Sequence, residues 1–281
     1  MKLNKGISTI GIVFIVLIII LVAGFMFQKY GKLINSNTDS IKSPHNKTTP
    51  EDSENDDETS SPEEKPKVAI ILDDLGNSFK IDKKIANIDD NINLAILPGR
   101  DSTLATANYF NELDRFQLLL HMPLEPIAAK DVEEDMIMTN MSRNEIKLEV
   151  DKYFNQLGSY IEGVNNHKGS QYSSNKNKVK ILLEEVKKKN LFFVDSFTYK
   201  DSVIYETAKE LNIETARRDI FLDNSNNKDD IKRRLEETLE LAKEEGEAIA
   251  IGHARPNTIS VLKEEIPNKE VDFVKLSEIL E

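Results

Sequence analysis

Hydrophobic and polar positions divide the chain into three parts with different patterns. Residues 10–27 form one uninterrupted apolar run without a charged side chain. Residues 28–66 are polar, and eight carboxylates lie between Glu51 and Glu64 with no basic residue among them. From residue 67 onwards, short apolar runs alternate with longer segments in which apolar residues recur every three or four positions. Each part therefore needs its own interpretation.

The apolar run of residues 10–27 predicts a transmembrane helix. Its length is about the minimum for crossing a bilayer, whereas the apolar core of a cleaved signal peptide is usually only ~7 to 15 residues long. We therefore expect an uncleaved signal anchor, with a cleaved signal peptide as the alternative. A short basic N-terminus, here residues 1–9, usually stays in the cytoplasm. The rest of the chain is then expected outside the cytoplasm, held at the cell membrane by a single pass.

The composition of residues 28–66 predicts a disordered acidic tether. Their few apolar side chains bury too little surface to offset the conformational entropy lost on ordering. Residues 67–281, by contrast, carry enough apolar runs to build a core. We expect a fragment of residues 67–281 to be soluble, to fold alone and to carry about one divalent metal.

Short apolar runs in residues 67–281 predict the strands of a parallel sheet. Most of them lack the alternation of a strand with one wet face, so they are typical of strands buried on both sides. The segments between them have a helical period and begin near Ser or Asp, which are good N-caps. The predicted strands are 68–72, 94–97, 118–120, 160–164, 191–194, 213–216 and 248–251, and the predicted helices are 142–157, 173–190, 202–211 and 229–245. About seven such units favour a distorted or incomplete (β/α) barrel, with a doubly wound open sheet as the alternative.

Composition and charge narrow the chemistry. The chain contains no cysteine, which excludes disulfides, thiolate zinc sites and a cysteine nucleophile. The formal net charge is -12, so a nucleic-acid partner bound through its phosphates is not expected. Any metal must be held by histidine and carboxylate side chains.

Unusual polar residues follow the predicted strands. All three histidines of residues 67–281 lie in such positions, at the carboxyl ends where parallel α/β folds gather their active sites. The residues are Asp73 and Asp74, His121, Asn165 to His167, Asp195 and Ser196, Arg218 and Asp219, and His253 after the last predicted strand. Three histidines at equivalent points of the fold predict a functional site.

These side chains suit a metal-assisted hydrolase. One carboxylate and two imidazoles can hold a divalent metal with an open position, where it lowers the pKa of water to ~7 and polarises a carbonyl group. Successive strand residues point apart, so only one of Asp73 and Asp74 is expected to bind the metal, which leaves the other free as a general base. The remaining histidine can then protonate a leaving group. The alternatives are backbone capping for the two aspartates and a turn position for His167.

Six segments together resemble the successive motifs of the divergent polysaccharide deacetylases, the YibQ-like proteins. The segments are AIILDDLG (69–76), LLHMPLEP (119–126), GVNNHKGS (163–170), FVDS (193–196), RDIFLD (218–223) and IAIGH (249–253). They span nearly all of residues 67–281 in the right order, so the resemblance is specific. That family is a distant relative of the NodB-like carbohydrate esterases, which remove acetyl groups from N-acetylated sugars with a metal bound by one aspartate and two histidines.

The resemblance implies roles for five residues. Asp73 matches the catalytic base and Asp74 a metal ligand of the NodB-like enzymes, and His253 matches their catalytic acid. Those enzymes take both metal-binding histidines from one His-x-x-x-His motif, which this sequence lacks. His121 and His167 must therefore supply two ligands from separate strand ends, as the divergent family suggests. Zinc is the expected metal.

The resemblance also implies a set of supporting or substrate-binding residues. These are Glu125, Asn166, Asp195, Ser196 and Arg218. Glu125 is expected either as a fourth ligand or as the residue that orients His121, and Asp195 has the same two alternatives for His167. Position 197 is Phe where the family leads us to expect Arg, so any role of that arginine passes to Arg218.

The expected function is metal-dependent removal of acetyl groups from an acetylated polysaccharide or amino-sugar glycan at the cell envelope. The main alternative is a carbohydrate-binding or envelope-organising protein that keeps the fold without activity. A metal hydrolase of another ester or amide is the third candidate. The chain has no tryptophan and only 7% aromatic residues, which counts against a long glycan because sugar sites often use aromatic faces.

Overall fold

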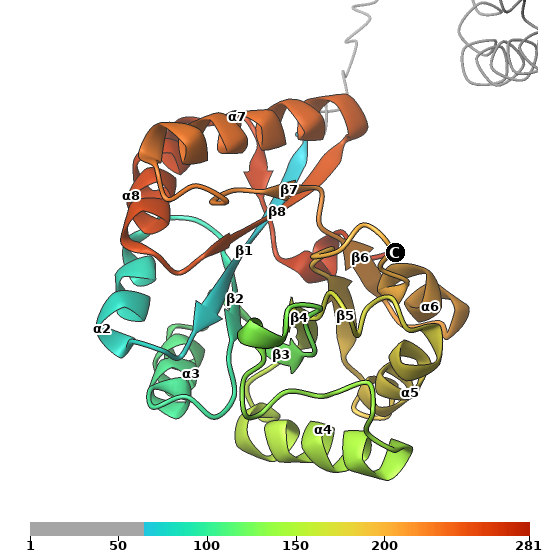
Figure 1. Cartoon of the computed structure of the whole chain (residues 1–281). Coiled ribbons are helices and arrows are strands. Elements are labelled where there is room, and N and C mark those ends of the chain that lie inside the picture. Colours follow the sequence, from blue (N-terminus) through green and yellow to red (C-terminus); the bar gives the residue numbers. More distant parts are fainter. Residues whose placement is uncertain (1–64) are drawn as a thin grey trace, which may run out of the picture. The chain divides into compact units, whose positions relative to one another are not determined.

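The strands of residues 65–281, the part of the chain that the computed structural model describes, form one curled parallel sheet (Figure 1). They are β1 (Lys67–Leu75), β2 (Asn93–Ile96), β3 (Gln117–Leu124), β4 (Gly163–Lys168), β5 (Phe192–Asp195), β6 (Thr215–Arg217), β7 (Ile220–Phe221), β8 (Glu247–His253) and β9 (Asp272–Phe273). Their order is β6-β5-β4-β3-β2-β1-β8-β7, with β9 beside β1. The predicted incomplete (β/α) barrel is confirmed. In a closed (β/α) barrel, the last strand of the barrel pairs with the first. Here β8, and not β7, pairs with β1, so the doubly wound alternative is wrong.

Helices cover the outer face of the curled sheet (Figure 1). They are α2 (Phe79–Asp82), α3 (Thr103–Leu113), α4 (Arg143–Leu157), α5 (Lys176–Lys187), α6 (Ile204–Glu210), α7 (Lys228–Glu245) and α8 (Pro256–Glu265). The helix α4 begins as predicted at Ser142, whose hydroxyl accepts from the Glu145 backbone N–H while the Glu145 carboxylate accepts from the Ser142 N–H. The helix α3 lies outside the predicted set because its buried face includes Thr103 and Thr106, which weaken the apolar period.

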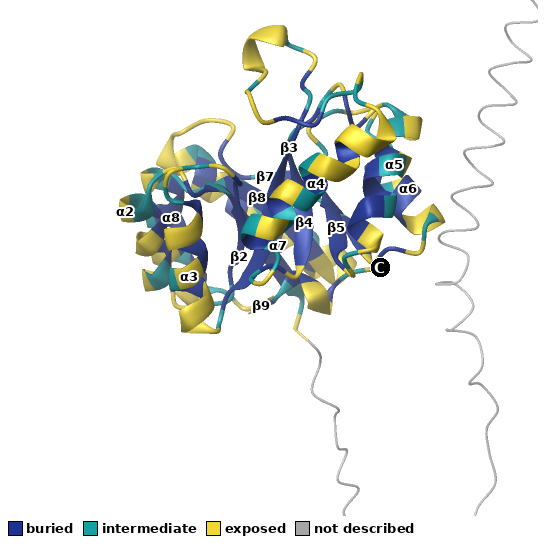
Figure 2. Ribbon diagram, turned by 90° about the horizontal axis from the view of Figure 1, so that it is seen from below, coloured by how far each residue is buried: buried dark blue, intermediate teal, exposed yellow. Residues whose placement is uncertain are grey.

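Alternate side chains along the strands build two cores. Outward side chains such as Ile70 and Leu72 pack under the helices, and inward ones such as Ile71 and Leu119 pack inside the curl. Burial accordingly concentrates on the strands and on the inner faces of the helices, whereas the outer helix faces are exposed (Figure 2). This packing on both faces explains why the strands read as continuous apolar runs in the sequence.

The strands extend further toward their carboxyl ends than predicted. Asn165, Asn166 and His167 lie within β4, and Asp73 pairs in register with His253 of β8. The side chains that point into the curl are therefore apolar in the middle of the strands and polar at the carboxyl ends. The inward polar side chains are Asp73, His121, Asn165, His167, Ser196, Arg218 and His253.

The C-terminal segment, residues 272–281, closes the opposite end of the barrel. The Leu276 N–H donates to the Asn93 side-chain oxygen at 3.0 Å, and the Ser277 N–H donates to Gln117 at 3.2 Å. Thr215 and Glu281 exchange two backbone hydrogen bonds. Asn93 and Gln117 are fully buried polar side chains, and this segment supplies the backbone donors to their side-chain oxygens.

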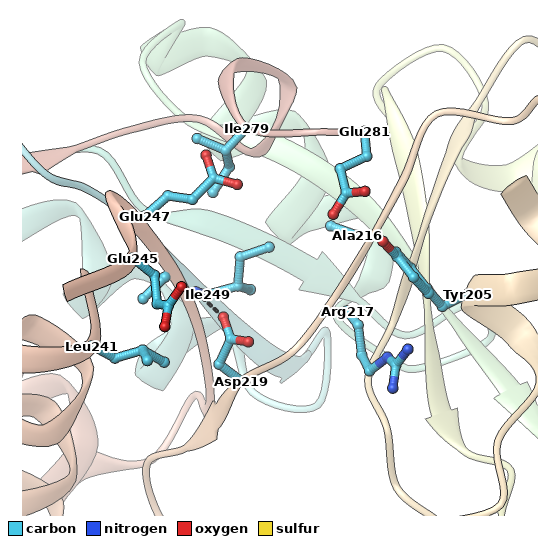
Figure 3. Close-up of a pocket in the computed structure, with 11 residues that line it drawn as sticks. Tyr205, Ala216, Arg217, Asp219, Leu241, Glu245, Glu247, Ile249, Ile279 and Glu281 are labelled. Atoms are coloured by element: carbon cyan, nitrogen blue, oxygen red, sulfur yellow. Dashed lines mark hydrogen bonds between the residues drawn. The ribbon is translucent and has the colours of Figure 1, made fainter. Parts of the chain in front are cut away.

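The barrel stays open along a seam between β6 and β7, the two edges of the sheet. A cavity of about 560 Å³ lies along this seam, toward the amino ends of the strands. Figure 3 shows it between Tyr205 and Arg217 on one side and Glu245 and Glu247 on the other, with Asp219 accepting the Ile249 backbone N–H. Its lining contains no histidine among the described residues.

The transmembrane helix predicted for residues 10–27 lies outside the described residues, and so does nearly all of the predicted tether. Within residues 65–281, no helix is long and apolar enough to cross a membrane.

Replacement of Leu276 tests the contribution of the C-terminal segment. Leu276 is fully buried inside the curl, so Leu276→Ala should lower the free energy of unfolding of the 65–281 fragment by about 2 to 5 kcal/mol. Leu148→Ala on α4 is the matched control, because Leu148 is largely exposed and its removal should change the free energy by less than about 0.5 kcal/mol. Urea denaturation measures both. Equal effects would show that residues 272–281 do not contribute to the core.

Candidate metal centre

Three candidate ligand atoms converge at the carboxyl end of the barrel. The Asp74 Oδ1 lies 3.3 Å from His121 Nε2 and 3.1 Å from His167 Nδ1, and the two ring nitrogens are 3.1 Å apart. For a tetrahedral zinc site, bond lengths of 2.0–2.1 Å place neighbouring ligand atoms about 3.3 Å apart. The Asp74 Oδ1 is buried without a hydrogen-bond donor, as a ligand atom would be. Among the described residues, these three form the group suited to hold a metal ion.

Hydrogen bonds on the far sides of the two rings orient them toward that point. The Asn165 Nδ2 donates to Asp73 Oδ1 at 2.8 Å, so the Asn165 oxygen, 2.8 Å from His121 Nδ1, accepts from that nitrogen. The His167 Nε2 lies 3.2 Å from the Glu133 carboxylate and donates to it. Each ring therefore turns an unprotonated nitrogen toward Asp74, which is the tautomer that a metal requires.

Charge in this group of side chains favours a cation. Burial raises the pKa of Asp74, but the hydrogen bonds and positive charge that the two imidazoles supply when they are protonated outweigh burial and hold it far below its usual range. Burial lowers the pKa of His121, yet the carboxylates of Asp73 and Asp74 outweigh it and raise that pKa. Protons and a divalent metal thus compete for the same place, and metal affinity should fall at acid pH.

Asp73 lies beside the three ligand atoms without being one of them. Its Oδ2 is 3.7 Å from His121 Nε2, and its Oδ1 accepts from Asn165. Burial raises the pKa of Asp73 despite the opposing effects of His121 and Asn165. A carboxylate with a raised pKa is a stronger base than an ordinary one, which suits general-base catalysis.

A break in β1 allows both aspartates to reach the site. The pairing of β1 with β2 shifts in register between Leu72 and Leu75, and Asp74 has a left-handed backbone with φ of 65°. Only a few per cent of non-glycine residues adopt this conformation, and it often marks a functional position. Asp82 holds the following turn by accepting from the Gly76 backbone N–H.

His253 faces the site from β8 and is backed by Asp223. Its Nδ1 is 2.8 Å from Asp223 Oδ1, and its Nε2 is 3.7 Å from Asp74 Oδ2. Asp223 also accepts from the His253 backbone N–H and from the Thr258 hydroxyl, so its carboxylate is fixed on several sides. Burial lowers the pKa of His253, but the bond to Asp223 outweighs it and raises that pKa. Asp223 belongs to a recognised motif, and its role becomes visible only in the structure.

Three of the predicted supporting residues brace the walls of the site. The Asn166 side chain accepts from the Ser196 N–H and donates to the Lys168 carbonyl, and Asn166 lines the same cavity as the candidate ligands. The Ser196 Oγ lies 3.3 Å from Asn165 Nδ2. The Arg218 guanidinium donates to the carbonyls of Ser196 and Phe197, which places it on the turn after β5.

The positions of Glu125 and Asp195 correct two expectations. The Glu125 carboxylate accepts from the Thr139 N–H at 2.5 Å, and Asp195 accepts from the Phe197 N–H and the Ser202 hydroxyl. These contacts stay within the surrounding loops, because Glu125 lies beyond the end of β3 and Asp195 is on the outward row of β5. The side chains that contact the far ring nitrogens of His121 and His167 are instead Asn165 and Glu133.

A cavity of about 420 Å³ opens over this group of residues, within the size range of small-molecule sites. Its lining includes Asp73, Asp74, His121, His167, Ser196, His253, Lys168, Phe221 and Arg255. The seam cavity is larger, but the titratable groups with converging geometry lie here. His253, Asp73 and the candidate metal centre thus share one opening.

Comparison with known proteins agrees with this geometry. An uncharacterized protein of Haemophilus influenzae is 35% identical over 207 residues, covering 74% of this chain and 73% of that protein. The uncharacterized protein YibQ of Escherichia coli is 29% identical over 223 residues, covering 79% and 69%. A crystal structure of an uncharacterized Agrobacterium tumefaciens protein has the same fold, with a TM-score of 0.71 at 20% identity, covering 78% of this chain and 91% of that one.

The family match covers the barrel almost from end to end. Residues 70–280 match the family described as divergent polysaccharide deacetylase, a range that contains every residue of the candidate metal centre. This match confirms the resemblance of the six sequence segments, and the chain belongs to the divergent polysaccharide deacetylase family.

Proposed function

We propose that this protein is a metal-dependent hydrolase that removes acetyl groups from an acetylated glycan. The observation that carries the proposal is the arrangement of Asp74, His121 and His167 around one point, with Asp73 and His253 on either side in the same cavity. Membership of the divergent polysaccharide deacetylase family supports an acetylated carbohydrate as the substrate class.

The side chains divide into ligands, a base and an acid. A divalent metal held by Asp74, His121 and His167 would polarise the acetyl carbonyl and make water more acidic. Asp73 takes the proton from the attacking water, since its carboxylate is buried, adjacent and free of the ligand set. His253 donates a proton from Nε2 to the departing amine or alcohol.

Asp223 supports His253 in this role. Its contact with Nδ1 fixes the ring so that Nε2 faces the cavity, and its negative charge stabilises the protonated imidazole. Zinc is the metal we propose, because two imidazoles and one carboxylate form a common donor set of catalytic zinc sites.

The proposed place of action is the cell envelope. The apolar run of residues 10–27 and the acidic segment of residues 28–66 support a membrane anchor with a tether, and the lysines before the run support an extracytoplasmic domain. The direct test is metal content measured together with acetate release from a panel of N- and O-acetylated glycans. Glycan binding without acetate release by the metal-loaded protein would instead support the inactive binding protein.

Substitution of the ligands and of the base should separate their roles. His121→Ala and His167→Ala should each abolish metal retention, because either change opens the ligand set. Asp73→Asn should keep the metal and lose acetate release, because a base lies outside that set. Elemental analysis and an acetate assay on the same preparations measure both. Metal loss in Asp73→Asn with retention in Asp74→Asn would mean that the two aspartates have the opposite roles.

His253→Ala tests the proton donor. The variant should retain metal and glycan affinity while kcat falls by roughly 10² to 10⁴-fold, the usual contribution of a positioned histidine. Steady-state kinetics, glycan binding and metal analysis on this variant measure the three quantities. Loss of metal together with an unchanged kcat at saturating metal would exclude His253 as the acid.

Asp223→Asn tests the pH dependence. A donor must be protonated, so activity falls as pH rises through the pKa of His253, and Asp223 is the main cause that raises this pKa. Without that carboxylate the pKa falls, so the alkaline limb of the pH profile should move to lower pH with the acid limb unchanged. A profile of kcat/KM against pH measures the shift. An unmoved alkaline limb would assign it to another group.

A further inference from the structure

One carboxylate joins two loops and the end of a strand beside the candidate metal centre. Glu133 lies in the connection between β3 and α4, Arg100 lies between β2 and α3, and Lys168 ends β4 next to His167. The Glu133 Oε1 is 3.2 Å from His167 Nε2 and 2.6 Å from Lys168 Nζ, and its Oε2 pairs with the Arg100 guanidinium. Three donors, one from the β2–α3 loop and two from the end of β4, thus meet on a single side chain.

We propose that Glu133 is a positioning residue for the metal ligand His167, and that Arg100 and Lys168 hold its carboxylate in place. This inference rests on the proposed metal dependence. Glu133 accepts from the ring nitrogen that faces away from Asp74 and His121, so it acts through His167 and does not join the ligand atoms. With Nε2 carrying the proton, Nδ1 keeps the lone pair that a metal requires.

An ordinary surface ion pair does not account for this arrangement. Exposed pairs typically contribute about 0 to 1 kcal/mol and leave their partners free to move. Here the Glu133 side chain is only 30% exposed, and that of its partner His167 is 11% exposed. Lys168 also donates to the Asp131 carbonyl at 2.8 Å, so it fixes the backbone of the loop as well as the carboxylate.

The two histidine ligands are therefore held in different ways. His121 is oriented by Asn165, a neutral side chain from the adjacent strand, in register with it. His167 is oriented by a charged side chain from a loop whose neighbouring residues, such as Ile127 and Val132, are exposed. Order of the β3–α4 loop and retention of the metal should consequently depend on each other.

The test compares Glu133→Gln with Glu134→Gln in the full chain. The first variant removes the charge that holds His167, and the second removes a charge from the adjacent, exposed position. Zinc affinity, measured by competition with a chelator, should fall by about 10 to 100-fold in Glu133→Gln and stay within about twofold of wild type in Glu134→Gln. At saturating zinc, kcat of Glu133→Gln should return to within a few-fold of wild type, because the residue acts on the ligand and not on substrate.

A second variant keeps the inference testable if Glu133→Gln disturbs the loop. The double substitution of Arg100→Gln and Lys168→Gln leaves the carboxylate but removes the two side chains that hold it, so zinc affinity should fall by a smaller factor. Melting of the metal-free variants controls for folding. Wild-type zinc affinity in both Glu133→Gln and the double variant would overturn the inference. Failure of the wild-type protein to bind zinc, cobalt or manganese would instead overturn the proposed function.

Discussion

The alternation of side chains along curled parallel strands is the constraint on which both the core and the candidate site depend. On each strand, every second side chain points into the barrel. The apolar side chains of the core and the polar side chains of the candidate site are therefore fixed by the same strand register. In β1 these side chains pass from Ile71 to Asp73, and in β8 they pass from Ile251 to His253. A shift of one residue in either strand would bury the wrong face and remove a functional group at once.

Buried charge sets a second requirement. Two adjacent carboxylates, one buried and one partly buried, repel each other unless positive charge lies between them. Two imidazoles lie within 4 Å of these carboxylates and become positively charged when they are protonated. Protonation, however, uses the nitrogen lone pairs that face Asp74. A divalent cation satisfies the carboxylates and the imidazoles together, which a proton cannot do. The charges of this group therefore favour a divalent cation, as the proposed function requires.

Much of the fold and of the site could be predicted from the sequence. Apolar runs located the strands, and the polar residues after them located Asp73, Asp74, His121, His167 and His253, which the structure brings into one cavity. The contact of Asn165 could have been predicted, because side chains alternate between the two faces of a strand. Asn165 therefore shares the face of His167, and Asn166 lies on the opposite face. Glu133 was not, since its loop has no period that ties it to a strand. Residues 272–281 were equally hidden, because β9 is only two residues long.

The C-terminal segment places a condition on how the barrel folds. Leu276 bonds to Asn93 across 183 positions of the chain, and the last residue, Glu281, bonds to Thr215. Contacts of such long range form late and slow folding, since a large loop must close before they form. The amino end of the barrel is complete only when residues 272–281 have joined it, so a chain that emerges from its amino end first cannot complete the barrel until these residues have been synthesised. Without residues 272–281 the side-chain oxygens of Asn93 and Gln117 would lose their backbone N–H donors, and the barrel would be open at both ends.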